Sequence, residues 1–215
     1  MVTPAPSIVP LAASAGHAVL SRYVWAGPGW DLALHALSDG GWRVARSRWV
    51  AGVRHLWHYA WASGRLRALD HTIFLVDDDR FVEAERYRAR AGPNLHAHPI
   101  TLPGVLALGA PIPVVPGATV TLRYAGAARI TLGGIPHDID ACCLDAEEGD
   151  RRGRQWLARG VGEIALGSVD GGYTRWMTAW RGGDDASWAP LPAALADRAE
   201  WPPLPEIAPG DGGLW

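Results

Sequence analysis

The sequence predicts a mainly β protein, an antiparallel meander folded as a sandwich or a barrel, with extended Pro-rich arms at both ends. Glycine and proline supply 26 and 17 of the 215 residues, and because this excess has no Gly-X-Y period, it indicates many short elements joined by turns. Apolar and polar residues alternate between the turn clusters, as they do in strands with one buried face. Hydrophobic residues make up 48% and charged residues 20% of the chain, which is typical of a packed protein.

The first 15 residues are predicted to form an extended N-terminal arm. Pro4, Pro6 and Pro10 lie among small and apolar residues. Proline removes a backbone donor and fixes φ, so these residues favour an extended chain over a helix. We therefore end the arm at residue 15 and begin the β core at residue 16.

Residues 16–92 are predicted to form the first part of the core, an antiparallel meander of about five strands. Clusters of Gly, Asp and Ser recur roughly every 10–12 residues, the spacing of turns in up-and-down sheets. Within one segment Trp42 and Val44 alternate with Arg43, which places them on opposite faces of a strand. The stretch 82–91 suits a charged helix or an edge strand, and we favour the strand.

Residues 97–182 are predicted to form the second part, as a second sheet or a subdomain, so that the core spans 16–182. The segment around Val120 and Leu122 shows the clearest alternation in the chain. The charged run 145–154 is predicted to be a loop, and another hairpin follows it.

Residues 183–215 are predicted to form a Pro- and Trp-rich C-terminal arm. Six prolines in this stretch forbid sustained helix or sheet. Burying an indole stabilises a protein by about 2–3 kcal/mol, so we expect the arm to lie on the chain's own β core or on a neighbouring subunit. The residues that we assign to an interface are Trp188, Trp201 and Trp215.

Charge and cysteine content limit the classes of partner and compartment. All 20 basic residues are Arg and the formal net charge is −2, which argues against a dedicated nucleic-acid binder. No apolar run approaches about 18 residues, so we expect no membrane span. Cys142 and Cys143 are adjacent and give no disulfide framework, which favours synthesis in a reducing cytoplasm, followed by incorporation into a particle.

Three histidines are candidate metal ligands. His96 and His98 are two residues apart, and on a strand both imidazoles would point to one face and could hold a divalent metal ion. His137 would have to complete the site from elsewhere in the chain. The alternative for this pair is a solvated loop, and we predict no other cofactor.

Catalytic signatures are scarce. The chain lacks the GxSxG, HExxH and P-loop patterns, so we assign no catalytic residue and favour a non-enzymatic protein. A thiolate of Cys142 or Cys143 beside His137 would be a nucleophile, but the alternation around them predicts that one cysteine is buried in the core. A redox role for the pair is left open.

Tryptophan is the most unusual component, with 12 residues against 2 Phe and 5 Tyr. Several indoles alternate with Arg, and guanidinium groups stack well on indole rings. This pattern predicts either a binding face, for example for a glycan, or Trp–Arg ladders that stiffen a sheet. The residues that we assign to the binding face are Trp42, Trp49, Trp57, Trp61, Arg48 and Arg54.

These observations together favour a structural or assembly component of a larger complex. A β core with clasping arms and near-neutral charge suits a phage or phage-like virion protein of the tail, tail tip or capsid, associated with like or unlike protein subunits. A carbohydrate-binding β module is the first alternative. A metal-dependent β-barrel enzyme that uses His96 and His98 is the second.

Overall fold

The computed structural model describes residues 4–24, 27–50, 52–77, 79–88, 100–132, 134–184, 186–198 and 200–202. It confirms that the protein is mainly β and that its strands pair antiparallel. One sheet holds 14 strands and a second sheet holds two. Within the described ranges, no helix is both long and apolar enough to cross a membrane.

The elements have the following bounds. They are β1 Ile8–Pro10, β2 His17–Val19, η1 Leu20–Tyr23, β3 Asp31–Leu37, β4 Trp42–Val50, β5 Val53–Ala62, β6 Arg65–Val76, β7 Arg80–Arg88, β8 Ile100–Pro103, β9 Val105–Ala107, β10 Pro111–Val115, β11 Ala118–Leu132, β12 Ile135–Glu148, β13 Arg151–Ala158, β14 Gly162–Ser168, β15 Tyr173–Arg181, β16 Ser187–Ala189 and α1 Ala193–Ala196.

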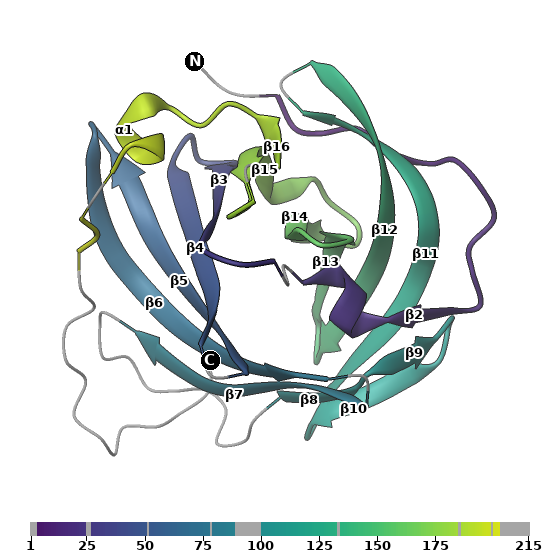
Figure 1. Ribbon diagram of the computed structural model, residues 1–215. Coiled ribbons are helices and arrows are strands. Elements are labelled where there is room, and N and C mark those ends of the chain that lie inside the picture. The colour runs from purple at the N-terminus through teal and green to yellow at the C-terminus, as the bar shows by residue number, and fades with distance from the viewer. Residues whose placement is uncertain are drawn as a thin grey trace.

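The large sheet curls around the molecule. Its strand order is β1-β11-β12-β13-β14-β15-β3-β4-β5-β6-β7-β8, with β10 also paired to β11 and β16 to β15. Figure 1 shows β3–β6 on one side of the molecule and β11 and β12 on the other. Because β8 lies beside β10, the two ends of the sheet approach each other. The small sheet pairs β2 with β9.

The meander predicted for residues 16–92 is present as β3 to β7, five consecutive antiparallel strands. The β3–β4 turn uses Gly40 at φ 84°, a left-handed conformation that glycine adopts without strain. The backbone N–H of Gly41 donates to Asp39 Oδ1 at 2.8 Å, which closes this turn. The described part of the stretch 82–91 lies in β7, so the strand was the correct alternative.

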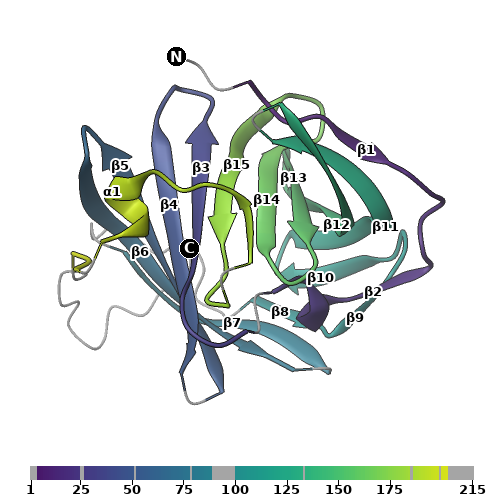
Figure 2. The same ribbon diagram turned by 45° about the horizontal axis from the view of Figure 1, so that its top comes forward.

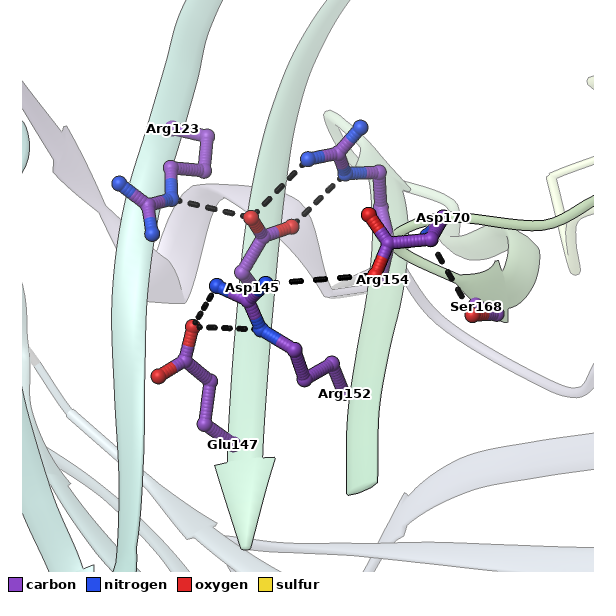
Figure 3. Close-up of polar contacts among 7 residues, drawn as sticks. All are labelled: Arg123, Asp145, Glu147, Arg152, Arg154, Ser168 and Asp170. Atoms are coloured by element: carbon purple, nitrogen blue, oxygen red, sulfur yellow. Dashed lines mark hydrogen bonds and ion pairs between the residues drawn. The ribbon is translucent and has the colours of Figure 1, made fainter. Parts of the chain in front are cut away.

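The loop predicted over 145–154 was wrong. Strand β12 continues to Glu148 and β13 begins at Arg151, so only a two-residue turn separates them. The charges form ion pairs between neighbouring strands: Asp145 accepts from Arg123 at 3.0 Å and from Arg154 at 2.7 Å (Figure 3). Opposite charges across strands stabilise a sheet, so this charge run extends a hairpin.

The buried residues lie on both faces of the sheet. Alternate side chains of β12 enter different clusters: Cys143 packs in one with Ile130 and Trp156, and Cys142 in another with Leu106. A third cluster surrounds Leu34, Val44, Tyr59 and Leu195. Both cysteines are therefore buried, where the sequence predicted one.

The described part of the N-terminal arm lies along the chain's own sheet. Strand β1 pairs with β11, and the backbone N–H groups of Leu11 and Ala15 donate to the carbonyls of Ala127 and Ala125 at 2.9 and 2.7 Å. In Figure 2 this segment runs beside β11 along the side of the molecule.

The described part of the C-terminal segment also packs on the chain itself. Strand β16 pairs with β15, and the chain then crosses in front of β3 and β4 to α1 (Figure 2). Leu195 in α1 is only 1% exposed and sits in the cluster around Val44 and Tyr59. Arg181 Nη2 donates to the carbonyl of Ala196 at 3.0 Å and holds the end of the helix.

Leu195→Ala is expected to lower the free energy of unfolding by about 2–3 kcal/mol, because it leaves a cavity between α1 and the sheet. Urea unfolding of the full chain measures this effect. Leu11→Ala is the control, because Leu11 is 45% exposed and its loss should change stability by less than about 0.5 kcal/mol. Equal effects of the two substitutions would show that α1 is not docked in solution.

Candidate functional site

The six residues predicted to form the binding face are divided between the two faces of the sheet. Neighbours along a strand point to opposite faces, so the side chains of Arg48 and Trp49 lie on opposite faces of the sheet. The register pairs Arg48 with His55, and Trp49 with Arg54. Trp42, Trp57, Trp61 and Arg48 therefore share one face, and Trp49 and Arg54 lie on the other.

Trp42 and Trp61 belong to the core beneath the C-terminal segment. Their rings meet edge to face, with centroids 6.1 Å apart at 74°. Both pack against the cluster that contains Leu195. Their main contribution is therefore to packing.

Trp57 and Arg48 belong to a half-buried surface cluster that includes four residues missed in the sequence. We call it the aromatic face. Strands β4, β5 and β6 and the residue before β3 supply its members, of which only Arg48 is exposed. They are Trp30, Arg46, Arg48, His55, Trp57 and His71.

The rings of the aromatic face contact one another in sequence. The register aligns Arg46, Trp57 and His71 on neighbouring strands. The Trp57 and His71 rings are parallel within 5° at a centroid distance of 4.4 Å. The Trp30 ring also contacts Trp57, with a centroid distance of 5.2 Å and an angle of 55° between the ring planes. Such contacts hold each ring in one orientation.

The two imidazoles of the aromatic face are joined end to end. His55 Nδ1 and His71 Nε2 are 2.9 Å apart, one donating and the other accepting. Their ring centroids are 5.1 Å apart, close to the greatest separation that this N···N contact permits. Burial lowers the pKa of His55, and Arg48 lowers it further. A neutral imidazole is therefore favoured at His55.

Two guanidinium groups stack on the Trp30 ring. The Cζ atoms of Arg46 and Arg48 lie 3.4 and 4.4 Å from its centroid, within the range of cation–π attraction. Arg46 also lies 4.7 Å from the Trp201 ring. Trp201 in turn packs on Tyr59, with centroids 5.1 Å apart.

A close approach of two backbones fixes the loop that carries Trp30. A Cβ atom on Gly183 would lie 2.1 Å from the carbonyl oxygen of Pro28 and 3.0 Å from Gly29. Only glycine fits there, so the loop before β3 and the turn after β15 are locked together. The position of Trp30 over β4 and β5 follows from this contact.

Arg54 does not reach the surface, which corrects its assignment to the binding face. It is 7% exposed and lies against Asp31 and Ser47, which are 4% and 0% exposed. Arg54 Nη2 donates to Ser47 Oγ at 3.0 Å and lies 3.8 Å from Asp31 Oδ2. The Ser47 hydroxyl donates to Asp31. Asp31 on β3 and Ser47 on β4 are both buried, and the Arg54 guanidinium is buried with them because it bonds to both.

A second, partly buried polar group was missed in the sequence. Arg175 Nε and Nη2 donate to the two Glu163 carboxylate oxygens at 2.6 and 2.8 Å, and Gln155 adds a third bond at 2.8 Å. Burial opposes ionisation of Glu163, but Arg175 outweighs it and holds the pKa of Glu163 at about 2. His35 Nε2 donates to the Glu163 carbonyl at 3.2 Å, and burial lowers the pKa of His35 to about 4.

On the same inward-facing side of β5 and β6, His58 Nδ1 donates to Asp70 Oδ1 at 2.6 Å.

The candidate metal ligands are not brought together in the part of the chain that the structure describes. His96 and His98 lie outside the described residues. His137 stacks on Trp188, with centroids 6.0 Å apart at 22°. Among the described residues, no group of three or more His, Cys, Asp or Glu side chains could hold a metal ion.

The two cysteines are poor nucleophiles. Burial raises the pKa of Cys143 to about 12 and also raises the pKa of Cys142. The thiolate is the reactive form of cysteine, so both side chains behave as small apolar core groups.

The tryptophans assigned to an interface pack on the chain's own sheet where they are described. Trp188 contacts Trp180, with centroids 5.8 Å apart, and Trp201 contacts Tyr59. Trp215 lies outside the described residues. Of the two surfaces that we expected to receive the C-terminal arm, the described part occupies the chain's own core.

The chain was compared with family models, with curated proteins and with solved structures, and no match was found.

Proposed function

We propose that the protein is a non-enzymatic component of a larger assembly and that it binds a protein partner through the aromatic face. The observation that carries this proposal is a half-buried surface of Trp, Arg and His side chains that are already held in place. Trp and Arg are the residue types that dominate the energetics of protein interfaces.

Pre-organisation of the face supports this proposal. Immobilising a long side chain on binding costs about 0.5–1.5 kcal/mol. Here Arg46 is already stacked on Trp30 and Trp201, and His71 is hydrogen-bonded to His55. These side chains have therefore already lost much of their conformational entropy during folding. Less entropy would be lost on binding, which favours higher affinity for a partner.

The alternative of a glycan ligand has less support from this geometry. A sugar ring stacks on an open aromatic face, but Trp57 has His71 parallel against it and Trp30 has Arg46 over its ring. A partner that makes contacts at the edges of these groups suits the face better. A phage or phage-like particle remains the assembly that we expect, on the sequence argument.

In this proposal the C-terminal segment stabilises the aromatic face and does not itself bind the partner. Trp201 contacts both Tyr59 and the Arg46 guanidinium, so the segment supports one edge of the aromatic face. This role differs from our first expectation, in which the arms themselves gripped a neighbouring subunit.

Trp30→Ala is expected to weaken assembly at least about tenfold, because loss of a central interface tryptophan typically has an effect of this size or larger. The full chain, tagged in its natural host, is purified gently and its native mass is measured. Trp49→Ala is the matched control, because Trp49 is also half-buried but lies on the opposite face.

The proposal requires a stoichiometric complex for the wild type and for Trp49→Ala, with its loss in Trp30→Ala. Circular dichroism and thermal unfolding establish that each variant is folded. A wild-type chain that is monomeric in its host, or an intact complex with Trp30→Ala, would contradict the proposal.

A further inference from the structure

Two arginines of the aromatic face, Arg46 and Arg48, differ from many others in the described part of the chain. Arginines elsewhere in the described chain are commonly paired with a carboxylate. Such pairs are Arg54–Asp31, Arg80–Asp77, Arg123–Asp145, Arg129–Asp138, Arg152–Glu147, Arg154–Asp145, Arg159–Asp140 and Arg175–Glu163. Among the residues that the structure describes, no carboxylate lies within ion-pair distance of Arg46 or Arg48.

The guanidinium groups of Arg46 and Arg48 both stack on Trp30. Both lie over the same indole ring, at 3.4 and 4.4 Å from its centroid. Burial lowers the pKa of Arg46, Tyr59 partly opposes this effect, and Arg48 adds to it. The same Arg48 charge lowers the pKa of His55. The protein thus maintains a local repulsion between like charges at this place.

Stacking leaves the donors of these guanidiniums available. The N–H groups of Arg lie in the plane of the guanidinium, whereas the stack on indole uses its flat side. Arg46 donates one hydrogen bond to the Tyr59 hydroxyl, and Arg48 is exposed. The paired N–H groups of a guanidinium have the spacing of the two oxygens of a carboxylate.

We propose that the aromatic face binds an acidic protein segment, whose Asp or Glu carboxylates accept hydrogen bonds from the guanidinium groups of Arg46 and Arg48. This inference rests on the proposed function and specifies the chemistry of its partner. The incoming charge would relieve the repulsion between the two guanidiniums, and the indole and imidazole rings would limit their exposure to water. Ion pairs in such a setting are stronger than those on an open surface.

A blocked, tryptophan-free peptide rich in Glu is the probe, and the matched peptide with Gln in place of Glu is its control. Isothermal titration with the full chain at low salt should show binding of the Glu peptide. The Gln peptide should bind at least about tenfold more weakly, because hydrogen bonds to charged groups contribute strongly. Affinity for the Glu peptide should fall as salt is added.

Arg48→Gln should weaken binding of the Glu peptide at least about tenfold. Arg65→Gln is the matched control, because Arg65 is exposed on the same β6 strand that carries His71 but is not stacked on an aromatic ring. Equal losses in both variants, or equal affinity for the Glu and Gln peptides, would overturn the inference. Competition by inorganic phosphate at peptide-like concentrations would also overturn it, because the site would then take any oxyanion.

The two proposals fail in different ways. If Trp30→Ala abolishes the complex in the host but the Glu peptide does not bind, the aromatic face is a docking surface and its acidic partner is refuted. If the Glu peptide binds through Arg48 but Trp30→Ala leaves the complex intact, the face binds an acidic segment and the proposed role in assembly is refuted.

Discussion

Arg54→Met should lower the free energy of unfolding by about 3–5 kcal/mol, which is the typical result of removing one partner of a buried charge pair. Asp31 would keep its place on β3, 4% exposed, without the guanidinium that now offsets its burial. Burial already raises the pKa of Asp31, and Arg54 opposes this effect. The variant should therefore lose least stability at low pH, where Asp31 is protonated.

Urea unfolding of the full chain measures this loss. The double variant Arg54→Met, Asp31→Leu should recover most of it, because an apolar pair of similar volume often replaces a buried ion pair at little cost. Arg152→Ala removes an exposed pair with Glu147 and should cost less than about 1 kcal/mol. A similarly small effect of Arg54→Met would mean that water reaches the interior of the sheet.

Acid should destabilise the protein in two pH ranges, one for His35 and a lower one for Glu163. Burial lowers the pKa of His35 from 6.5 to about 4, so the unfolded chain binds more protons between these values. The contribution of neutral His35 is complete above pH 6.5 and is lost as the pH falls toward 4. The linked change in the free energy of unfolding is about 3 kcal/mol.

Glu163 acts in the lower range. Its pKa falls from 4.5 to about 2 because Arg175 outweighs the effect of burial. The contribution of the ionised carboxylate is complete above pH 4.5 and is lost as the pH falls toward 2, by about 3 kcal/mol.

Unfolding curves recorded from pH 7 to pH 2 test both ranges. Relative to wild type, His35→Gln should flatten the curve of stability against pH between 6.5 and 4, and Glu163→Gln should flatten it below 4.5. An unchanged pH dependence in His35→Gln would show that this imidazole is not held neutral by the fold.

The regular strands could be predicted because apolar and polar residues alternate along them in the sequence. Alternation and turn clusters located β3 to β7, and the alternation around Leu122 lies in β11. Charge misled the prediction over 145–154, because a run of Asp, Glu and Arg is typical of a solvated loop. Whether such charges pair across strands depends on register, as for Asp145 with Arg154, and register is not visible in a single sequence.

The binding face was predicted in part. Trp57 and Arg48 could be found because Trp and Arg stand out in composition and alternate along this part of the chain, whereas Trp30, Arg46, His55 and His71 were missed. These four join the face through pairing between strands and through the contact of Gly183 with the loop that carries Trp30. Arg54 was misplaced because alternation shows that neighbours point apart but not which side faces inward.

The pairing of β15 with β3 has a consequence for biosynthesis. Thr178 Oγ1 donates to the Leu34 carbonyl across 144 residues of chain. The edge of β3 that does not face β4 therefore stays unpaired until β15 has been synthesised. Contacts this distant in sequence slow folding and leave strand edges exposed to aggregation in the meantime. A nascent chain that stalls before residue 173 would emerge from the ribosome with an uncovered β3 edge, and chaperones would be its first binding partners.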